Sequence, residues 1–259
     1  MVNALVPPKG ALVVLVRVFV DETNTHAQAP TMAVAGYIFT RTGAKIFTRK
    51  FSKKLHKYGL PYFHMKECAV NTGVFGHMTD KQCDEVARKL IECTRNYSEY
   101  GFAVSLHKDT YKKVVPATLE NRLGSEYSFC LRGALILVRR WIERNRFTGD
   151  VAYFFESGAK HEGEANLILT DMFENEVVKK VYHHASHAFV EKRKFPLLAP
   201  ADMFAWLYQN ALKKEAAGKP MRKDFAALLR PQDMKMDFNE TNLTEMFDRL
   251  RAGRPWYFD

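Results

Sequence analysis

The chain has 259 residues, 47% of them apolar and 13% aromatic, and its 39 Lys and Arg against 29 Asp and Glu give a formal charge of +10. This composition excludes a disordered or low-complexity chain and supplies enough apolar residues for one large core. The excess of cations favours a polyanionic partner such as nucleic acid, because phosphate contacts release counterions.

The N-terminal region fits neither a secretory signal nor a membrane span. Its apolar run is interrupted by Arg17 and followed directly by two acids. The four cysteines (Cys68, Cys83, Cys93 and Cys130) contain no CxxC pair, which favours buried, reduced thiols. We therefore expect a soluble, cytoplasmic protein that forms one domain over residues 1–259, with a core at about 11–215 and a C-terminal helical extension at 216–259.

The first third of the chain is typical of strands followed by a helix. Residues 11–20 are apolar at nearly every position, which predicts a central strand covered on both faces. Residues 31–40 predict a second strand, and a Thr-Gly turn at 41–43 suggests a third strand at about 44–50. Residues 79–96 predict a helix that opens with a Thr-x-x-Gln capping box.

The remainder alternates helix and strand. Such alternation after two early strands predicts an α/β sandwich built around a mixed sheet. No Gly-rich nucleotide-binding motif follows any of the predicted strands. The predicted strands lie at 101–107, 151–155 and 188–191, the predicted helices at 125–146, 163–180 and 200–214, and short helices follow from 218 onward.

Three acidic residues are placed so that they can converge. Asp21 and Glu156 each come at the end of a buried strand, and Asp202 lies in the first turn of the helix that Pro200 opens. Clustered carboxylates repel one another, and a hard divalent cation such as Mg²⁺ or Mn²⁺ relieves that repulsion. Each acid by itself is also an ordinary turn or first-turn residue, so the hypothesis depends on all three together.

The chain resembles a family of mostly bacterial and phage proteins, domain of unknown function 3800, within the ribonuclease H-like superfamily. The resemblance spans nearly the whole chain, although Thr and Asn replace the family's Ser and Gly after the first two acids. Four short motifs carry it: Asp21-Glu22-Thr23-Asn24, Phe63-His64-Met65-Lys66-Glu67, Glu156-Ser157-Gly158 and Ala201-Asp202-Met203-Phe204-Ala205.

The resemblance implies a ribonuclease H-like mixed sheet flanked by helices, with Asp21, Glu156 and Asp202 as the metal-binding acids. A fourth carboxylate stays open: Glu67 belongs to a family motif, whereas Glu126 opens the helix after the third strand, where such folds usually place an acid. His64 has two interpretations, either a group that orients a carboxylate or moves a proton, or a structural histidine. Glu22 is expected to be a turn residue that faces away from Asp21.

The segment 41–57 holds seven cations and no acid, interleaved with Phe47 and Phe51. We expect the two phenylalanines to point into the core and the cations to contact a phosphate backbone. Further positive runs at 192–194, 213–214 and 222–223 flank the Asp202 helix. The predicted nucleic-acid contacts are Arg41, Lys45, Arg49, Lys50, Lys53, Lys54 and Lys57.

These features favour metal-dependent hydrolysis of phosphodiester bonds in RNA or DNA, with water as the nucleophile. In this interpretation Asp21, Glu156, Asp202, Glu67 and His64 are the catalytic candidates. The alternative is a non-catalytic module of a mobile-element or phage-defence system that binds nucleic acid or a protein partner.

Overall fold

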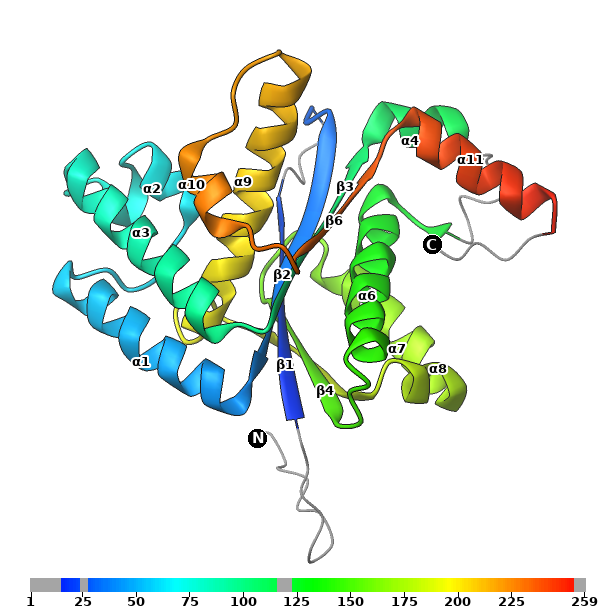
Figure 1. Ribbon diagram of the computed structural model, residues 1–259, viewed down its shortest axis with the longest axis horizontal. Coiled ribbons are helices and arrows are strands. Elements are labelled where there is room, and N and C mark those ends of the chain that lie inside the picture. Colours follow the sequence, from blue (N-terminus) through cyan, green and yellow to red (C-terminus); the bar gives the residue numbers. More distant parts are fainter. Residues whose placement is uncertain (1–14, 24–27, 116–122, 254–259) are drawn as a thin grey trace, which may run out of the picture.

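The computed structural model describes residues 15–23, 28–115 and 123–253, without the side chains of residues 250 and 251. Its centre is a six-stranded mixed sheet with the strand order β5-β4-β1-β2-β3-β6. Figure 1 shows this sheet nearly edge-on, with helices packed on both of its faces. The strands are β1 (Leu15–Thr23), β2 (Thr31–Thr40), β3 (Tyr100–His107), β4 (Asp150–Glu156), β5 (His184–Val190) and β6 (Met234–Phe238).

The middle of the sheet is apolar on both faces, which explains its central place. β1 pairs antiparallel with β2 and parallel with β4, so that Phe19 lies opposite both Tyr37 and Phe154. Along β1, Val16, Val18 and Val20 pack into one core, whereas Phe19 packs into the other. Side chains alternate across a strand, so consecutive apolar residues fill both layers.

Two helical layers complete these cores (Figure 1). One layer packs on the face that carries Phe19, and the other on the face that carries Val18. The first consists of α1 (Arg41–Lys57), α2 (Met65–Ala69), the 3-10 turn η1 (Gly73–Phe75), α3 (Asp80–Tyr97), the 3-10 turn η2 (Pro196–Leu198), α9 (Ala199–Ala216) and α10 (Lys223–Leu228). The second consists of α4 (Lys108–Val114), α6 (Glu126–Arg144), α7 (Glu162–Glu174), α8 (Glu176–Val181) and α11 (Glu240–Arg251).

The predicted α/β sandwich around a mixed sheet is confirmed, and so are buried, free thiols at all four cysteines. The strand predicted at 44–50 is wrong, because this segment belongs to α1. Thr40 caps that helix by accepting a hydrogen bond from the Gly43 N–H at 3.1 Å. The buried residues Ala44, Phe47, Phe51 and Leu55 recur every three or four positions, which is the period of a helix. Phe47 and Phe51 therefore do point into the core, as expected.

Further boundaries differ from the sequence-based prediction, and the strand predicted at 188–191 begins earlier, at His184. β1 extends through Thr23, so Asp21 and Glu22 lie inside the strand, and residues 11–14 of the predicted strand are outside the described residues. The helix predicted at 163–180 is two helices, because Asn175 ends α7 and caps α8 through its side chain. The segment after residue 216 is not wholly helical, since β6 adds an edge strand beside β3. Within the described residues, no helix has the length and apolar character needed to cross a bilayer.

Candidate active site

The three acids picked out in the sequence meet around one amine. The Nζ atom of Lys192 lies 3.3 Å from Asp21 Oδ2, 2.7 Å from Glu156 Oε2 and 3.3 Å from Asp202 Oδ1. These residues come from β1, the end of β4, the first turn of α9 and the loop after β5. Because β1, β4 and β5 are parallel neighbours, their carboxyl ends reach the same edge of the sheet.

Backbone contacts hold two of the acids in place. Asp21 Oδ1 accepts a hydrogen bond from the Glu22 N–H at 2.8 Å. Asp202 Oδ2 accepts one from the Met65 N–H at 2.6 Å, which ties α9 to the start of α2. The carboxylates are therefore set by the fold rather than by solvent, which favours a preformed cation site.

Lys192 compensates only part of the charge that the acids concentrate. With all groups ionised, three carboxylates and one ammonium leave a net charge of about −2 at the centre. Burial raises the pKa of Asp21, Lys192 opposes that change, and Asp202 and Glu156 reinforce it, so that the pKa reaches about 7. Burial by itself lowers the pKa of Lys192, but the three acids outweigh it and hold this pKa above its usual value. The lysine therefore stays protonated, while Asp21 exchanges its proton near neutral pH.

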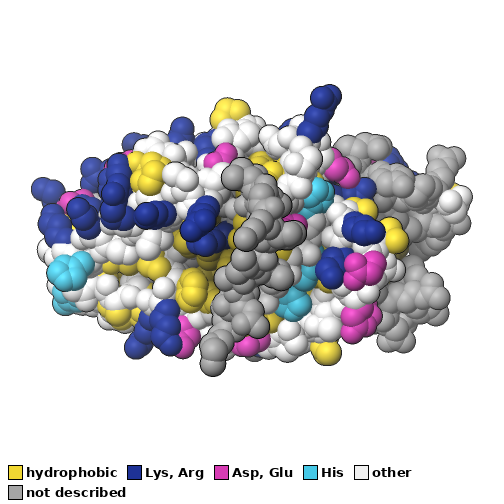
Figure 2. Space-filling model, turned by 90° about the horizontal axis from the view of Figure 1, so that it is seen from below, with side chains coloured by type: hydrophobic (Ala, Val, Ile, Leu, Met, Phe, Trp, Pro, Cys, Tyr) yellow, Lys and Arg dark blue, Asp and Glu magenta, His cyan; other side chains and the backbone are white. Residues whose placement is uncertain are grey.

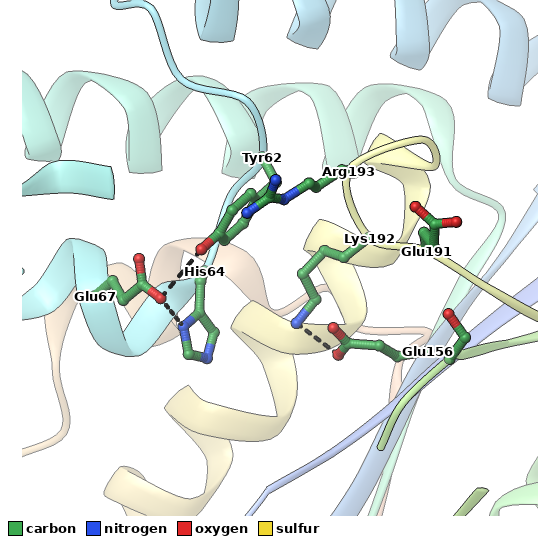
Figure 3. A pocket seen from close by; sticks show the side chains of 8 residues that line it. Tyr62, His64, Glu67, Glu156, Glu191, Lys192 and Arg193 are labelled. Carbon is green, nitrogen blue, oxygen red and sulfur yellow. Dashed lines mark hydrogen bonds and ion pairs between the residues drawn. The ribbon is translucent and has the colours of Figure 1, made fainter. Parts of the chain in front are cut away.

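His64 links this centre to Glu67. Figure 3 shows its imidazole ring beside Glu67, with Lys192 and Glu156 on the other side of it. Its Nδ1 atom lies 3.0 Å from Glu67 Oε1, and its Nε2 atom lies 3.7 Å from Asp202 Oδ1. Glu67 also accepts a hydrogen bond from the Val74 N–H at 3.1 Å. Burial raises the pKa of Glu67, but hydrogen bonds from His64 and Val74 outweigh it and lower the pKa. Glu67 thus stays ionised and fixes the orientation of His64.

Glycine at position 73 makes the Glu67 contact possible. Gly73 has a φ of +56°, and a Cβ atom there would come within 2.2 Å of Glu67 Oε2. The 3-10 turn can therefore fold back over the carboxylate only because this residue has no side chain.

A cavity of about 420 Å³ opens onto these groups. Its walls include His64, Glu67, Glu156 and Lys192, while Tyr62 and Arg193 lie at the side seen in the upper part of Figure 3. The Arg193 guanidinium lies 5.5 Å from the centre of the Tyr62 ring. The cavity thus combines partly exposed acids with two cations and an aromatic ring.

The donor atoms are of the type that a hard cation prefers, since carboxylate oxygens from three separate elements surround one point. Asp21 Oδ2 is fully buried and has no hydrogen-bond partner of acceptable geometry, which leaves a lone pair for another ligand. The Lys192 ammonium group occupies the point that the three carboxylates surround. As the structure stands, no group of acids, histidines or cysteines in the described residues is arranged tightly enough to hold a metal ion. Binding a metal there requires the ammonium group to move away.

Two other acids occupy different positions. Glu126, at the start of α6, lies 3.9 Å from Lys112 Nζ and is not among the carboxylates around Lys192. Glu67 is not among them either, although His64 links it to Asp202, so the choice of a fourth acid between Glu67 and Glu126 stays a prediction. Glu22 does face away from Asp21, but it is a half-buried strand residue and not a turn residue. Burial, followed by the charge of Asp21, raises its pKa to about 8.

The basic residues of the segment 41–57 divide into two groups along α1. Arg41, Lys45 and Arg49, in the N-terminal half, line a separate surface hollow. The C-terminal half is largely engaged with neighbouring side chains: Lys50 lies over the Tyr97 ring, and Lys54 and Lys57 pair with Glu85, while Lys53 is exposed.

Sequence reasoning missed the central role of Lys192. It noted the run 192–194 as a possible phosphate contact and did not pair it with the acids. A usable signal was present, because the run follows a predicted strand at the edge where the acids were expected. A lysine beside two buried acids and a half-buried one is the expected counterion.

Comparisons with known proteins identify no family for the chain. No family model and no curated protein sequence matches it. One solved structure, titled the PCNA:RNase HII complex from Archaeoglobus fulgidus, is similar over 95% of this chain and 92% of that chain. The identity is 13% and the TM-score is 0.40, and similarity of this size does not show a shared activity. The resemblance to domain of unknown function 3800 thus stays a prediction.

Proposed function

We propose that the chain hydrolyses phosphodiester bonds in RNA or DNA with the help of a divalent cation, on a ribonuclease H-like fold. The observation that carries this proposal is the meeting of Asp21, Glu156 and Asp202 around one cationic group at the edge of the sheet. The order of the acids, on the first strand, on a later parallel strand and on a late helix, is the order that the resemblance implies.

The charge of the centre supports a cation beyond Lys192. With Asp21 ionised, the centre has a net charge of about −2 and repels a phosphodiester, which is itself an anion. Asp21, Glu156 and Asp202 would hold Mg²⁺ or Mn²⁺ through their oxygens once Lys192 swings aside. Such an ion would polarise the phosphoryl group and lower the pKa of a water nucleophile.

The remaining residues of the cavity have roles that follow from their positions. Lys192, displaced from the acids, stays beside the centre and can neutralise a phosphate oxygen. Arg193 at the rim can bind the neighbouring phosphate, since a guanidinium pairs with phosphate through two hydrogen bonds. His64, held by Glu67 and close to Asp202, can take or return a proton at the edge of the centre.

Replacement of single acids tests the proposal. We expect Asp21→Asn and Asp202→Asn to lower Mn²⁺-dependent cleavage of labelled RNA and DNA by at least about 100-fold, because each removes charge that must hold the cation. Glu126→Gln is the matched control, since it removes a carboxylate that pairs with Lys112, and it should cleave like the wild type. Equal cleavage by all four proteins, with circular dichroism showing that they are folded, would contradict the proposal.

A second candidate function has its own support in the structure. Lys192 already contacts all three acids, so the centre can be a permanent ionic cluster within a protein that only binds nucleic acid or a protein partner. Calorimetric titration with Mn²⁺ separates the two candidates. A saturable site in the wild type that Asp202→Asn abolishes supports the hydrolase, and absence of heat in both supports the binding module.

A further inference from the structure

Four cationic side chains line a second hollow, near the start of β1. Arg17 comes from β1 and Arg41, Lys45 and Arg49 come from α1, around a volume of about 410 Å³. The three helix residues are spaced four apart, so they lie on one face of α1 at intervals of about 6 Å. Ala44 and Thr48 complete the described lining, which includes no acidic residue.

Within the described residues these four cations have no counterion, whereas two of the cations farther along α1 have one. In the described part of the chain, neither an ion pair nor a hydrogen bond reaches the side chain of Arg17, Arg41, Lys45 or Arg49. Farther along α1, Lys54 and Lys57 pair with Glu85 instead. The positive charge of the hollow is therefore not compensated within the described structure, and an anionic ligand would relieve the repulsion among these groups.

The hollow belongs to a wider cationic surface. Figure 2 shows Lys and Arg side chains gathered on the part of the molecule where α1 lies, with few acids among them. Such a surface attracts polyanions from a distance and orients them before contact. Three of the four cations that line the hollow are arginines, and the fourth is Lys45. Arginine pairs with phosphate oxygens through two parallel hydrogen bonds, and lysine acts as a point charge.

The hollow lies on the same face of β1 as the acid centre. Arg17, Phe19 and Asp21 alternate with residues that point to the other layer, and Phe19 marks the face that α1 covers. Asp21 is four residues along the strand from Arg17, a span of about 13 Å. In a DNA duplex, where the phosphates of one strand follow at about 3.4 Å along the axis, this span corresponds to about four nucleotides.

We propose that Arg17, Arg41, Lys45 and Arg49 form a binding site for a backbone phosphate of the nucleic acid whose cleavage is proposed above. The site would hold a phosphate a few nucleotides from the one at the acid centre, and it rests on the proposed function only for the identity of that ligand. Contacts of this kind set the register of the strand without reading its sequence.

Binding without cleavage tests the site. We would measure the affinity of the full chain for a labelled 20-nucleotide single strand by fluorescence anisotropy, in EDTA and at several salt concentrations. Arg49→Ala should weaken binding about fivefold at 0.1 M salt and lower the salt slope by about one. Arg41→Ala/Arg49→Ala should show roughly twice that change in slope.

Lys81→Ala is the matched control, because it removes one exposed cation from α3, outside the hollow. It should leave the affinity within a factor of two. Equal losses for Arg49→Ala and Lys81→Ala would mean diffuse attraction to the basic surface and would overturn the site, as would no loss for either. A protein that distinguishes the two variants but never cleaves would retain the phosphate site and refute the hydrolase.

Discussion

The two ends of β1 carry clusters of opposite charge, and only one of the clusters has a counterion in the described structure. At the Asp21 end, three acids are drawn together, and Lys192 lies among them as their counterion. At the Arg17 end, four cations gather on an open surface without a counterion in the described chain. The difference follows from burial. Asp21 is only 5% exposed, and like charges tolerate each other at the surface because water screens them, whereas inside the protein they need a partner.

This contrast explains why the two sites suit different ligands. The acid centre is prearranged around a cation, so another cation can enter only by exchange with Lys192. The basic hollow has no such occupant among the described residues, so an anion can bind directly. A nucleic acid substrate would therefore use both ends of β1. The basic hollow would bind one of its phosphates, and the acid centre would hold the divalent ion.

Removal of Lys192 should have the largest effect. Lys192→Met leaves two buried acids and the half-buried Glu156 without their counterion, and we expect it to cost about 3–5 kcal/mol of unfolding free energy, or about 10 °C in melting temperature. Millimolar Mn²⁺ should restore much of this loss, because a ligand that binds only the folded state stabilises it. Differential scanning calorimetry with and without Mn²⁺ measures both effects.

Arg230→Met is the control for that measurement. Arg230 forms a buried ion pair with Asp233 at 2.8 Å and donates to the Ser98 carbonyl at 2.7 Å, in a cluster that does not include the acid centre. Its loss should destabilise the protein by a similar amount, and Mn²⁺ should not restore it. If Mn²⁺ rescues neither variant, the acids at the Asp21 end do not accept a divalent ion.

The pH dependence of the unfolding free energy should also distinguish the two ends of β1, and we expect a smaller effect than that of removing Lys192. The pKa of Asp21 rises from 3.8 to about 7 on folding, and that of Glu22 from 4.5 to about 8. Between these values the folded state binds more protons than the unfolded state, so each group makes the protein less stable as the pH rises. We therefore expect Asp21→Asn and Glu22→Gln to gain about 1–3 kcal/mol on the wild type between pH 5 and pH 9 in EDTA.

Arg49→Ala should show no such trend relative to the wild type, because an arginine stays charged over this range. Urea unfolding of the four proteins at pH 5, 7 and 9 provides the comparison. A difference between Asp21→Asn and the wild type that is constant with pH would show that the carboxyl group is not forced toward its neutral form.

The sequence was sufficient to locate the acid centre because that centre depends on strand ends. Asp21 and Glu156 follow largely apolar runs, and parallel strands place their ends together. The choice between Glu67 and Glu126 could not be made in this way, since His64 and Glu67 lie at the start of the short helix α2, and no periodicity reveals that this helix lies beside Asp202. Lys192 could have been placed near the acids from the strand predicted before it, but not its contact with all three of them, because the path of its loop is not written in the pattern.

The basic end was harder to predict, because its shape depends on the correct period. Taken as a strand, residues 44–50 would also place Lys45 and Arg49 on one face, but about 13 Å apart instead of about 6 Å. As a helix, α1 places Arg41, Lys45 and Arg49 together and turns Lys54 toward Glu85. Arg17 joins them only through the packing of α1 against β1. The strand β6 was missed because its five residues, MKMDF, are short and only partly apolar.

The smallest expected effect concerns the stability of the basic end. Arg41→Ala/Arg49→Ala removes two cations without counterions in the described chain, and we expect the unfolding free energy to change by no more than about 0.5 kcal/mol. Any change should be a gain, because repulsion within the hollow is relieved, and the gain should shrink between 0.05 and 0.5 M NaCl as salt screens it. Thermal unfolding across that salt range measures it. A loss of about 2 kcal/mol or more would instead mean that these arginines hold the fold together, and the two ends of β1 would then not differ in the way that burial implies.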